Sequence, residues 1–178
     1  GFKPQDAPTW VGQNWSLNAG GVVSRAVRGN PDDAAHYYGQ SLVPPPNDLF
    51  EQQDLLRSIK LGNREMEPDQ YFYNFGNHSG KFIVLPDQQI IKKERDMLQI
   101  ATSCISCESG STITIVDENG NTYAFAAEEA TRMMLGDDPD PDPPAVRSYK
   151  YVSAWYLSSI TSADGREKMT FTYYYTLE

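Results

Sequence analysis

Two cysteines separated by two residues are the first candidates for chemistry in this sequence. Cys104 and Cys107 form a C-x-x-C motif, a spacing shared by thiol–disulfide exchange sites and by zinc sites. A redox site needs a helix N-terminus that lowers a thiol pKa, but polar loop residues flank this motif. A zinc site needs two further soft ligands, and His36 and His78 lie far apart in the sequence. We therefore interpret the pair as loop cysteines or a local disulfide of an exported protein.

Clustered carboxylates are the second group of candidates. Asp137, Asp138, Asp140 and Asp142 lie in the proline-rich run 137–144, which suggests calcium ligands at first sight. A calcium loop needs a glycine-enabled turn and a spaced Glu, whereas alternating prolines impose an extended path. The run therefore favours a solvated loop over a cation site.

Patterns typical of known catalytic centres are absent from the sequence. It contains no G-x-S-x-G, no H-E-x-x-H and no glycine-rich phosphate loop. Asp32 and Asp33 follow Asn-Pro, which is typical of a turn, and we expect Glu128 and Glu129 in solvent at the edge of an element. A carboxylate pair for glycoside hydrolysis stays an alternative, because the separation that matters between the two carboxyl groups is a distance in the folded protein and not a spacing in the sequence. We predict no catalytic, cofactor-binding or metal-binding residues.

Aromatic side chains are the third group. Runs such as Tyr37-Tyr38 and Tyr173-Tyr174-Tyr175 are suited to stacking on sugars or peptides. Adjacent residues on a strand face opposite sides, so Tyr174 should face away from its two neighbours and place an aromatic ring on the outer face. Packing within a sandwich or barrel is the favoured interpretation, and a carbohydrate- or peptide-binding surface is the alternative.

The elements that hold these side chains belong to an acidic chain of 178 residues. Lys and Arg number 15 against 24 Asp and Glu, which gives a formal net charge of −9. This balance disfavours nucleic-acid binders and polybasic membrane-surface modules. No apolar run approaches the length of a transmembrane helix. The length predicts a single domain, 1–178, that folds without a disulfide framework.

Turn signals between β-rich runs predict antiparallel hairpins. The runs 111–116 and 121–125 flank an Asn-Gly pair, for which we expect a type I′ turn with positive φ at both residues. The run 151–160 is expected to pair with a half-buried strand over 168–176. In that strand Met169, Phe171, Tyr173 and Tyr175 share one face, and Lys168, Thr170, Thr172 and Thr176 share the other.

Two further hairpins are predicted around glycine-rich turns. One joins 71–75 to 81–85 through 76–80, and the other joins 15–17 to 22–27 through 18–21. Glycines at 20, 21, 76 and 80 are expected to supply the positive-φ turns. Gly80→Val should accordingly destabilise the fold through its turn.

Helical patterns are few. Apolar residues over 48–60 predict one short helix, with Asn47 or Asp48 as its cap and Gly62 as its stop. The run 126–135 also favours helix by propensity. Loop insertions are predicted near 40–66 and 136–146. The predicted fold class is all-β, mainly antiparallel hairpins in a sandwich or barrel, with one short helix near 48–60.

Four segments together resemble one protein family. The run WVGQNWSLNAGGVVSRAVRGNPDD at 10–33 is similar to GLGWSLNAGGxIxRxVRGxPD, a segment ahead of the repeats in RHS/YD-repeat proteins of Bacteroidetes. The run 72–82 is similar to F-x-F-N-G-x-S-G-K-F, and 117–125 matches D-x-N-G-x-x-Y-x-F. Residues 154–173 resemble S-W-Y-L-x-K-I…G…I-x-F-x-Y. Gln13 and Asn14 depart from the pattern, and the chain has no YD repeat of its own.

The resemblance implies a noncatalytic scaffold or the entrance region of a β-shell, in a large secreted or cell-surface polypeptide. The implied partners are the YD-type repeats and C-terminal region of the same polypeptide, with a glycan or protein at the cell surface as a further one. Gly1 and the final run 173–178 also suggest an excised piece of a longer chain. A glycan- or peptide-binding sandwich and a glycosidase-like enzyme are the alternatives.

Arg25 and Arg28 lie among apolar residues and are three positions apart. On a strand they would face opposite sides, so we expect one of them to pair with a buried carboxylate such as Asp32 or Asp33. This role is structural rather than catalytic.

Overall fold

The computed structural model describes residues 20–29, 31–32, 48–60, 67–85, 88–103, 110–135 and 147–174. These residues form nine strands and one helix. In chain order they are β1 (Gly21–Ala26), α1 (Leu49–Lys60), β2 (Gln70–Phe75), β3 (His78–Val84), β4 (Ile90–Lys92), β5 (Gln99–Thr102), β6 (Ile113–Val116), β7 (Thr122–Leu135), β8 (Arg147–Thr161) and β9 (Lys168–Thr170).

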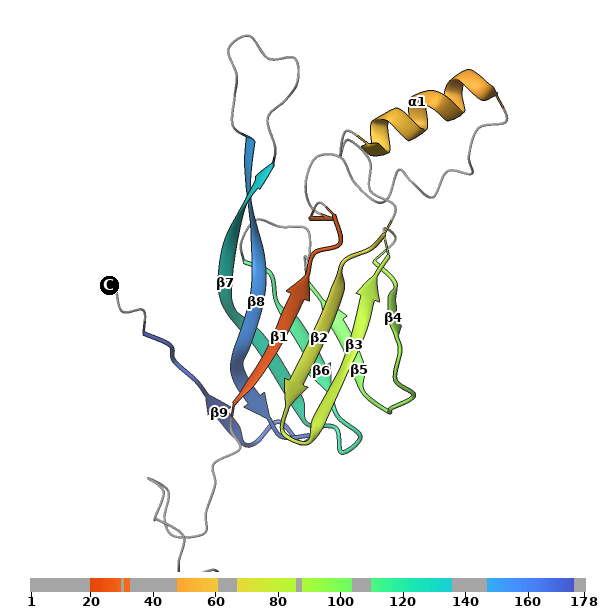
Figure 1. Ribbon diagram of the computed structural model, residues 1–178. Helices are drawn as coiled ribbons and strands as arrows, with labels where there is room; N and C mark the ends of the chain where they lie inside the picture. The colour runs from red at the N-terminus through yellow and green to blue at the C-terminus, as the bar shows by residue number, and fades with distance from the viewer. Residues whose placement is uncertain are drawn as a thin grey trace, which may run out of the picture.

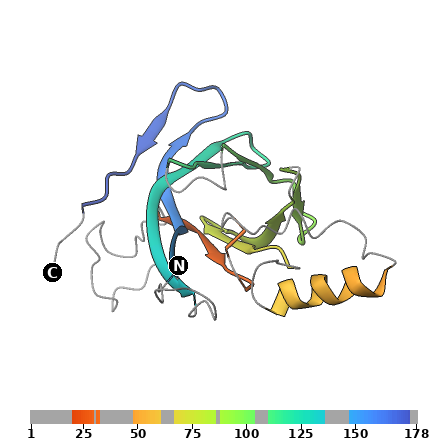
Figure 2. The ribbon, with the colours of Figure 1, turned by 90° about the horizontal axis from the view of Figure 1, so that it is seen from above.

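The strands form one antiparallel sheet that curls into a nearly closed barrel (Figures 1 and 2). Their order is β4-β3-β2-β1-β8-β7-β6-β5, and β9 pairs with β8 beside this path. The two edge strands, β4 and β5, are consecutive in the sequence, so the segment 93–98 runs across the seam between them. The predicted all-β class with one short helix is confirmed, and the sheet is barrel-like.

Alternating side chains of the strands fill the barrel. On β2, Tyr71, Tyr73 and Phe75 are buried, whereas Phe72 and Asn74 between them are exposed. The Tyr71 ring stacks on Phe82 with centroids 5.2 Å apart, next to the fully buried Trp155. The core comprises Val23, Tyr71, Tyr73, Phe75, Phe82, Val84, Leu98, Ile113, Ile115, Phe125, Val152, Trp155 and Leu157. The period-two pattern thus determines which residues lie inside.

β7 and β8 form the longest strand pair of the described chain, running from Thr122 opposite Thr161 to Leu135 opposite Arg147. The helix expected over 126–135 is therefore wrong. Cross-strand pairing with β8 satisfies the backbone of these residues and overrides their helical propensity.

Irregularities bend this pair around the barrel. The register shifts between Phe125 and Ala127, where β7 has an extra residue, and at two places where β8 has one, between Ala124 and Phe125 and between Glu129 and Ala130. The extra residues of β8 at these shifts are Ser158 and Ser153. Their hydroxyls donate to the backbone carbonyls of Ala124, at 2.8 Å, and Glu129, at 3.1 Å. Each serine therefore supplies a hydrogen bond where the bulge disturbs the ladder.

The predicted hairpin between β6 and β7 is confirmed, but the type I′ turn that we predicted for it is wrong. The Gly120 N–H donates to the Asp117 carbonyl at 3.0 Å, and Gly120 has φ of 83°. Asn119 is absent from the positive-φ residues, so the type I′ geometry does not form. Asp117 explains the difference, because its carboxylate accepts the N–H groups of Asn119 and Asn121 and favours a three-residue loop.

The β2–β3 hairpin is tighter than expected. Phe75 pairs with His78, which leaves Gly76 and Asn77 as the turn, and Gly76 has φ of 54°. Gly80 lies within β3 and Gly21 within β1, without positive φ, so the turn roles predicted for them were wrong. Gly20 likewise has no positive φ. Residues 15–17 of the fourth predicted hairpin lie outside the described residues.

Gly80→Val is still expected to destabilise the protein, for a different reason. A Cβ at this position would lie 2.6 Å from Cζ of the buried Tyr73 and 2.8 Å from Oε2 of Glu94. We expect a loss of about 1–3 kcal/mol of unfolding free energy, because the core must shift to admit the side chain. Urea unfolding measures it, with Gly20→Val as the control, since nothing lies near a Cβ there. Equal midpoints for Gly80→Val and the unmodified protein would contradict this account.

The last strand is shorter and more exposed than predicted. β9 comprises Lys168–Thr170, and all three side chains are exposed. Phe171 packs against the core, and the Tyr173 hydroxyl donates to the Leu157 carbonyl at 2.8 Å. The expected pairing with the run 151–160 is confirmed, because β9 pairs with β8, but the strand is shorter than 168–176 and is exposed rather than half-buried. Tyr175 and Thr176 lie outside the described residues. Tyr174 is 91% exposed, which confirms an aromatic ring on the outer face.

The predicted helix over 48–60 is confirmed as α1, which stands outside the barrel (Figure 2). The Asp48 carboxylate accepts the Phe50 N–H at 2.7 Å, as expected for a cap, and the proposed stop at Gly62 lies outside the described residues. Leu49, Phe50 and Leu56 are 73%, 80% and 66% exposed.

Candidate functional site

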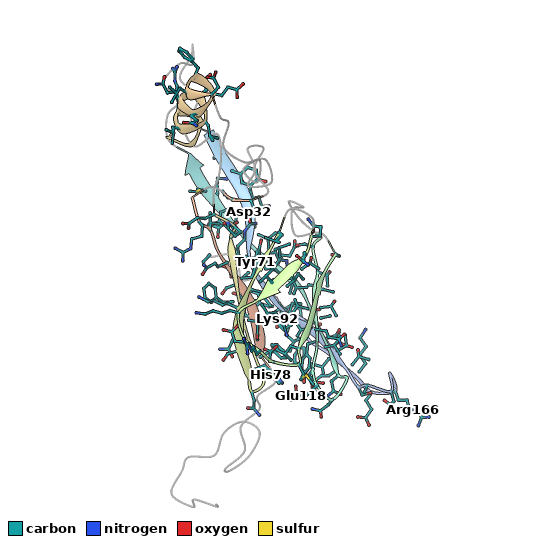
Figure 3. All side chains as sticks on the ribbon, turned by 90° about the vertical axis from the view of Figure 1, so that its right-hand side faces the viewer. Asp32, Tyr71, His78, Lys92, Glu118 and Arg166 are labelled. Carbon is teal, nitrogen blue, oxygen red and sulfur yellow. The ribbon has the colours of Figure 1, made fainter. Side chains whose placement is uncertain are left out.

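Several sequence candidates lie outside the described residues. They are Cys104, Cys107, His36, Asp33, Tyr37, Tyr38 and the acidic run 137–144. Among the described residues, His78 lies at one end of the barrel beside Glu118, with 3.8 Å between Nε2 and Oε2 (Figure 3). Its ring also lies 5.2 Å from that of Phe75, which makes it part of the packing at this end.

A buried ion pair joins β1 to the start of β2. Asp69 is completely buried, and its carboxylate accepts a hydrogen bond from Nε of Arg25 at 2.7 Å. Nη2 of Arg25 lies 2.6 Å from the same carboxylate oxygen. The guanidinium also lies over the Tyr71 and Tyr151 rings, 5.8 and 5.4 Å from their centroids. A charge pair held this tightly inside a barrel needs further hydrogen bonds to offset its desolvation.

Backbone groups of the following loop supply those bonds. Asp69 accepts the N–H of Arg28 at 2.8 Å and of Asp32 at 3.1 Å, and the Asp32 carboxylate accepts the Asp69 N–H at 2.9 Å. The prediction of a structural arginine is correct for Arg25, which pairs with Asp69, a partner that the sequence did not indicate; Asp33 lies outside the described residues. Asp32 completes the cluster through the backbone, in a turn as predicted.

A second buried polar cluster surrounds Trp155. Its indole Nε1 donates to Oγ of Ser111 at 2.7 Å, and that hydroxyl donates to Oε1 of Glu128 at 2.6 Å. Glu128 also accepts the N–H groups of Gly110 and Ser111, at 3.1 and 2.7 Å. The carboxylate thus fixes the chain ahead of β6 and orients the Ser111 hydroxyl, which accepts the hydrogen bond of the only polar group of the tryptophan.

Glu128 and Glu129 do not form a carboxylate pair. They are adjacent within β7, so their side chains point to opposite faces of the sheet. Glu129 lies outside and accepts the Tyr156 hydroxyl, which raises the pKa of Tyr156 above its ordinary value. Both glutamates are internal to a long strand, so the predicted position at the edge of an element is wrong. Glu129 is exposed as expected, whereas Glu128 is half-buried.

A third cluster closes the seam between β4 and β5. Nζ of Lys92 donates to the carboxylate of Asp96 and to the Leu98 carbonyl, and the Tyr73 hydroxyl donates to Asp96 at 2.6 Å (Figure 3 labels Lys92). Burial raises the pKa of Tyr73, and the hydrogen bond to Asp96 raises it further. Burial opposes ionisation of Asp96, but bonds from Lys92 and Tyr73 outweigh it and lower its pKa. The cluster therefore holds Asp96 charged and Tyr73 neutral.

Asp117 organises the β6–β7 turn. It accepts the N–H groups of Asn119 and Asn121 at 2.9 and 2.8 Å, the Asn121 amide at 3.0 Å and the Tyr123 hydroxyl at 3.2 Å. Burial acts to raise the pKa of Asp117, but these hydrogen bonds outweigh it and lower the pKa below its ordinary value.

Stability should consequently fall in acid. A carboxyl with a depressed pKa in the folded state contributes stability above its unfolded pKa, and this contribution is lost as the pH falls through the folded pKa. For Asp117 and Asp96 the loss of stability begins as the pH falls to about 3.8, the ordinary pKa of an aspartate carboxyl group. In Asp117→Asn, urea unfolding free energies measured from about pH 6 to about pH 2.5 should decline less steeply than in the unmodified protein. Parallel curves would show that Asp117 makes no such contribution.

No family model matches the sequence, and no curated protein or solved structure is significantly similar to it. In the described part of the chain, His, Cys, Asp and Glu do not gather in a group of three that could hold a metal ion. The helix of that part is too short and too polar to cross a membrane. Three of the four clusters above join distant segments of the barrel, and the fourth, at Asp117, fixes a turn.

Proposed function

We propose that this chain is a noncatalytic structural β-domain of a large cell-surface or secreted protein of the RHS/YD-repeat kind. It would serve there as a scaffold or as the entrance region of a β-shell. One observation carries the proposal: the segments that resemble the family coincide with the parts that build the barrel. The first segment contributes β1 with Arg25 and Asp32, and the second contributes the β2–β3 hairpin.

The other two segments support the proposal in the same way. The third is the β6–β7 turn that Asp117 organises around Gly120. The fourth includes Trp155 and the turn before β9, where Gly165 has φ of 71°. Residues shared with the family pattern therefore act in turns, in the core and in structural hydrogen bonds.

The described carboxylates support a noncatalytic role. Asp69, Asp117 and Glu128 each accept several hydrogen bonds from backbone N–H groups and neighbouring side chains. A general acid or base must instead exchange a proton with a substrate within hydrogen-bond reach. Carboxylates held in this way are suited to fixing the fold.

The coding sequence that follows the Glu178 codon tests the shell role. YD-type repeats are expected there, since the proposed domain precedes them in a longer polypeptide. A stop codon directly after Glu178 would overturn the shell role.

A second candidate function is glycan or peptide binding through exposed aromatic side chains. The rings of Tyr156 and Tyr173 lie 5.7 Å apart, and Tyr174 beside them is 91% exposed. A glycan array, followed by intrinsic-fluorescence titration, tests this candidate. Saturable binding that is lost in Tyr174→Ala would favour a binding module. Absence of binding to every glycan on the array would favour the scaffold.

A further inference from the structure

The far ends of β7 and β8 extend beyond the rest of the barrel as a two-stranded ribbon (Figure 1). β6 pairs with β7 from Thr122 to Phe125, and β1 pairs with β8 from Ala154 to Tyr156. The β7–β8 ladder continues past these contacts to Leu135 and Arg147. An isolated two-stranded ribbon is marginally stable in water, so this end of the sheet would gain from a third strand.

The two edges of the ribbon differ. On the β8 side, the Arg25 guanidinium from β1 lies over the Tyr151 ring, which places β1 and its following loop beside this edge. On the β7 side, none of the described strands pairs with residues 129–135. An edge of this kind presents alternate backbone N–H and C=O groups in the geometry that an added strand uses.

The ribbon is cationic within an acidic protein. Residues 129–135 and 147–153 include Arg132, Arg147 and Lys150 against one carboxylate, Glu129, which accepts the Tyr156 hydroxyl, whereas the whole chain has a formal net charge of −9. Arg132 and Lys150 are exposed and lie directly opposite one another in the β7–β8 register. Like charges in this arrangement repel, and an anionic side chain placed beside them relieves the repulsion.

We propose that the β7 edge over 129–135 binds an extended acidic peptide segment of another chain as an added antiparallel or parallel strand. Main-chain hydrogen bonds along the edge supply the affinity, carboxylates of the added strand lie beside Arg132 on β7, and the long side chain of Lys150 reaches toward them from β8. Ser148 adds a hydroxyl on the same face, 3.5 Å from Nη1 of Arg132. This inference does not depend on the shell role, because it uses the geometry and charge of the ribbon alone.

Fluorescence anisotropy on the full 178-residue chain tests the proposal with a labelled peptide in which Glu alternates with Val. We expect saturable binding, and hydrogen exchange should slow over 129–135. The double variant Arg132→Ala, Lys150→Ala should weaken binding by about 10-fold, given the usual strength of two exposed charge pairs. Arg166→Ala, at the far end of the molecule, is the matched control and should leave the affinity unchanged (Figure 3).

Two further peptides separate strand addition from simple charge attraction. The same peptide with every amide N-methylated keeps its charge but cannot donate main-chain hydrogen bonds, and it should not bind. A peptide with Lys in place of Glu should not bind either. Equal binding of either peptide, absence of saturable binding by the Glu peptide, or protection confined to β4 and β5 would overturn the proposal.

Discussion

Asp69→Ala should lower the free energy of unfolding by about 3–5 kcal/mol, because it leaves a buried guanidinium without its counter-charge. The Arg25 side chain is 1% exposed and cannot reach water without opening the barrel. The substitution also removes the acceptor for the N–H groups of Arg28 and Asp32. Urea unfolding, followed by tryptophan fluorescence to which the buried Trp155 contributes, measures the loss of unfolding free energy.

A second substitution separates the charge from the hydrogen bonds. The double variant Arg25→Met, Asp69→Leu removes both charges of this pair, so a large part of the lost stability should return. Recovery should be incomplete, since the two backbone N–H groups still lack their acceptor. Asp54→Ala on the exposed helix α1 should change stability by less than about 0.5 kcal/mol. An Asp69→Ala protein as stable as the Asp54→Ala control would contradict the structural role of the cluster.

Trp155→Ala is the second substitution expected to have a large effect. The side chain is fully buried against Tyr71, so truncation should cost about 3–5 kcal/mol of unfolding free energy through lost burial and the remaining cavity. Far-UV circular dichroism in urea is the suitable measurement, since this variant lacks the buried indole. Phe50→Ala is the matched control, because the Phe50 ring is 80% exposed on α1 and its removal should change the unfolding free energy little.

The Ser111 hydroxyl can be tested against the tryptophan in a double-mutant cycle. Ser111→Ala alone should cost about 1–3 kcal/mol, because the buried indole N–H then lacks an acceptor. In the Trp155→Ala background the same change should cost less, because that donor is gone. Equal costs in both backgrounds would show that the indole hydrogen bond adds nothing to stability.

Local chemistry in the sequence predicted the hairpins well. Turn residues such as Gly76 and Gly120 lie between runs of β-forming residues, and both the turn and the adjoining strands are local features. The turn type at Asn119 escaped prediction because a side chain outside the Asn-Gly pair, that of Asp117, determines it.

Long-range contacts account for the other errors. Asp69 lies 44 residues from Arg25, and no local pattern marks it as the partner. The run at 126–135 favours helix in isolation, and its strand structure depends on β8 more than a dozen residues further along. The seam cluster was also missed, because Tyr73, Lys92 and Asp96 meet only when the sheet curls into a barrel.

The clusters together explain how the barrel resists opening. Asp69 ties β1 to the start of β2, Glu128 ties β7 to the segment before β6, and Asp96 ties the seam to β2. Each uses a charged side chain to fix backbone groups. This arrangement is consistent with the structural role that we propose.

Electron microscopy of the full-length gene product tests that role most directly. The account predicts that this domain occupies a fixed position at the wall or opening of a closed β-shell. A domain found as a free module on a flexible tether, with no shell around or beside it, would contradict the proposed function.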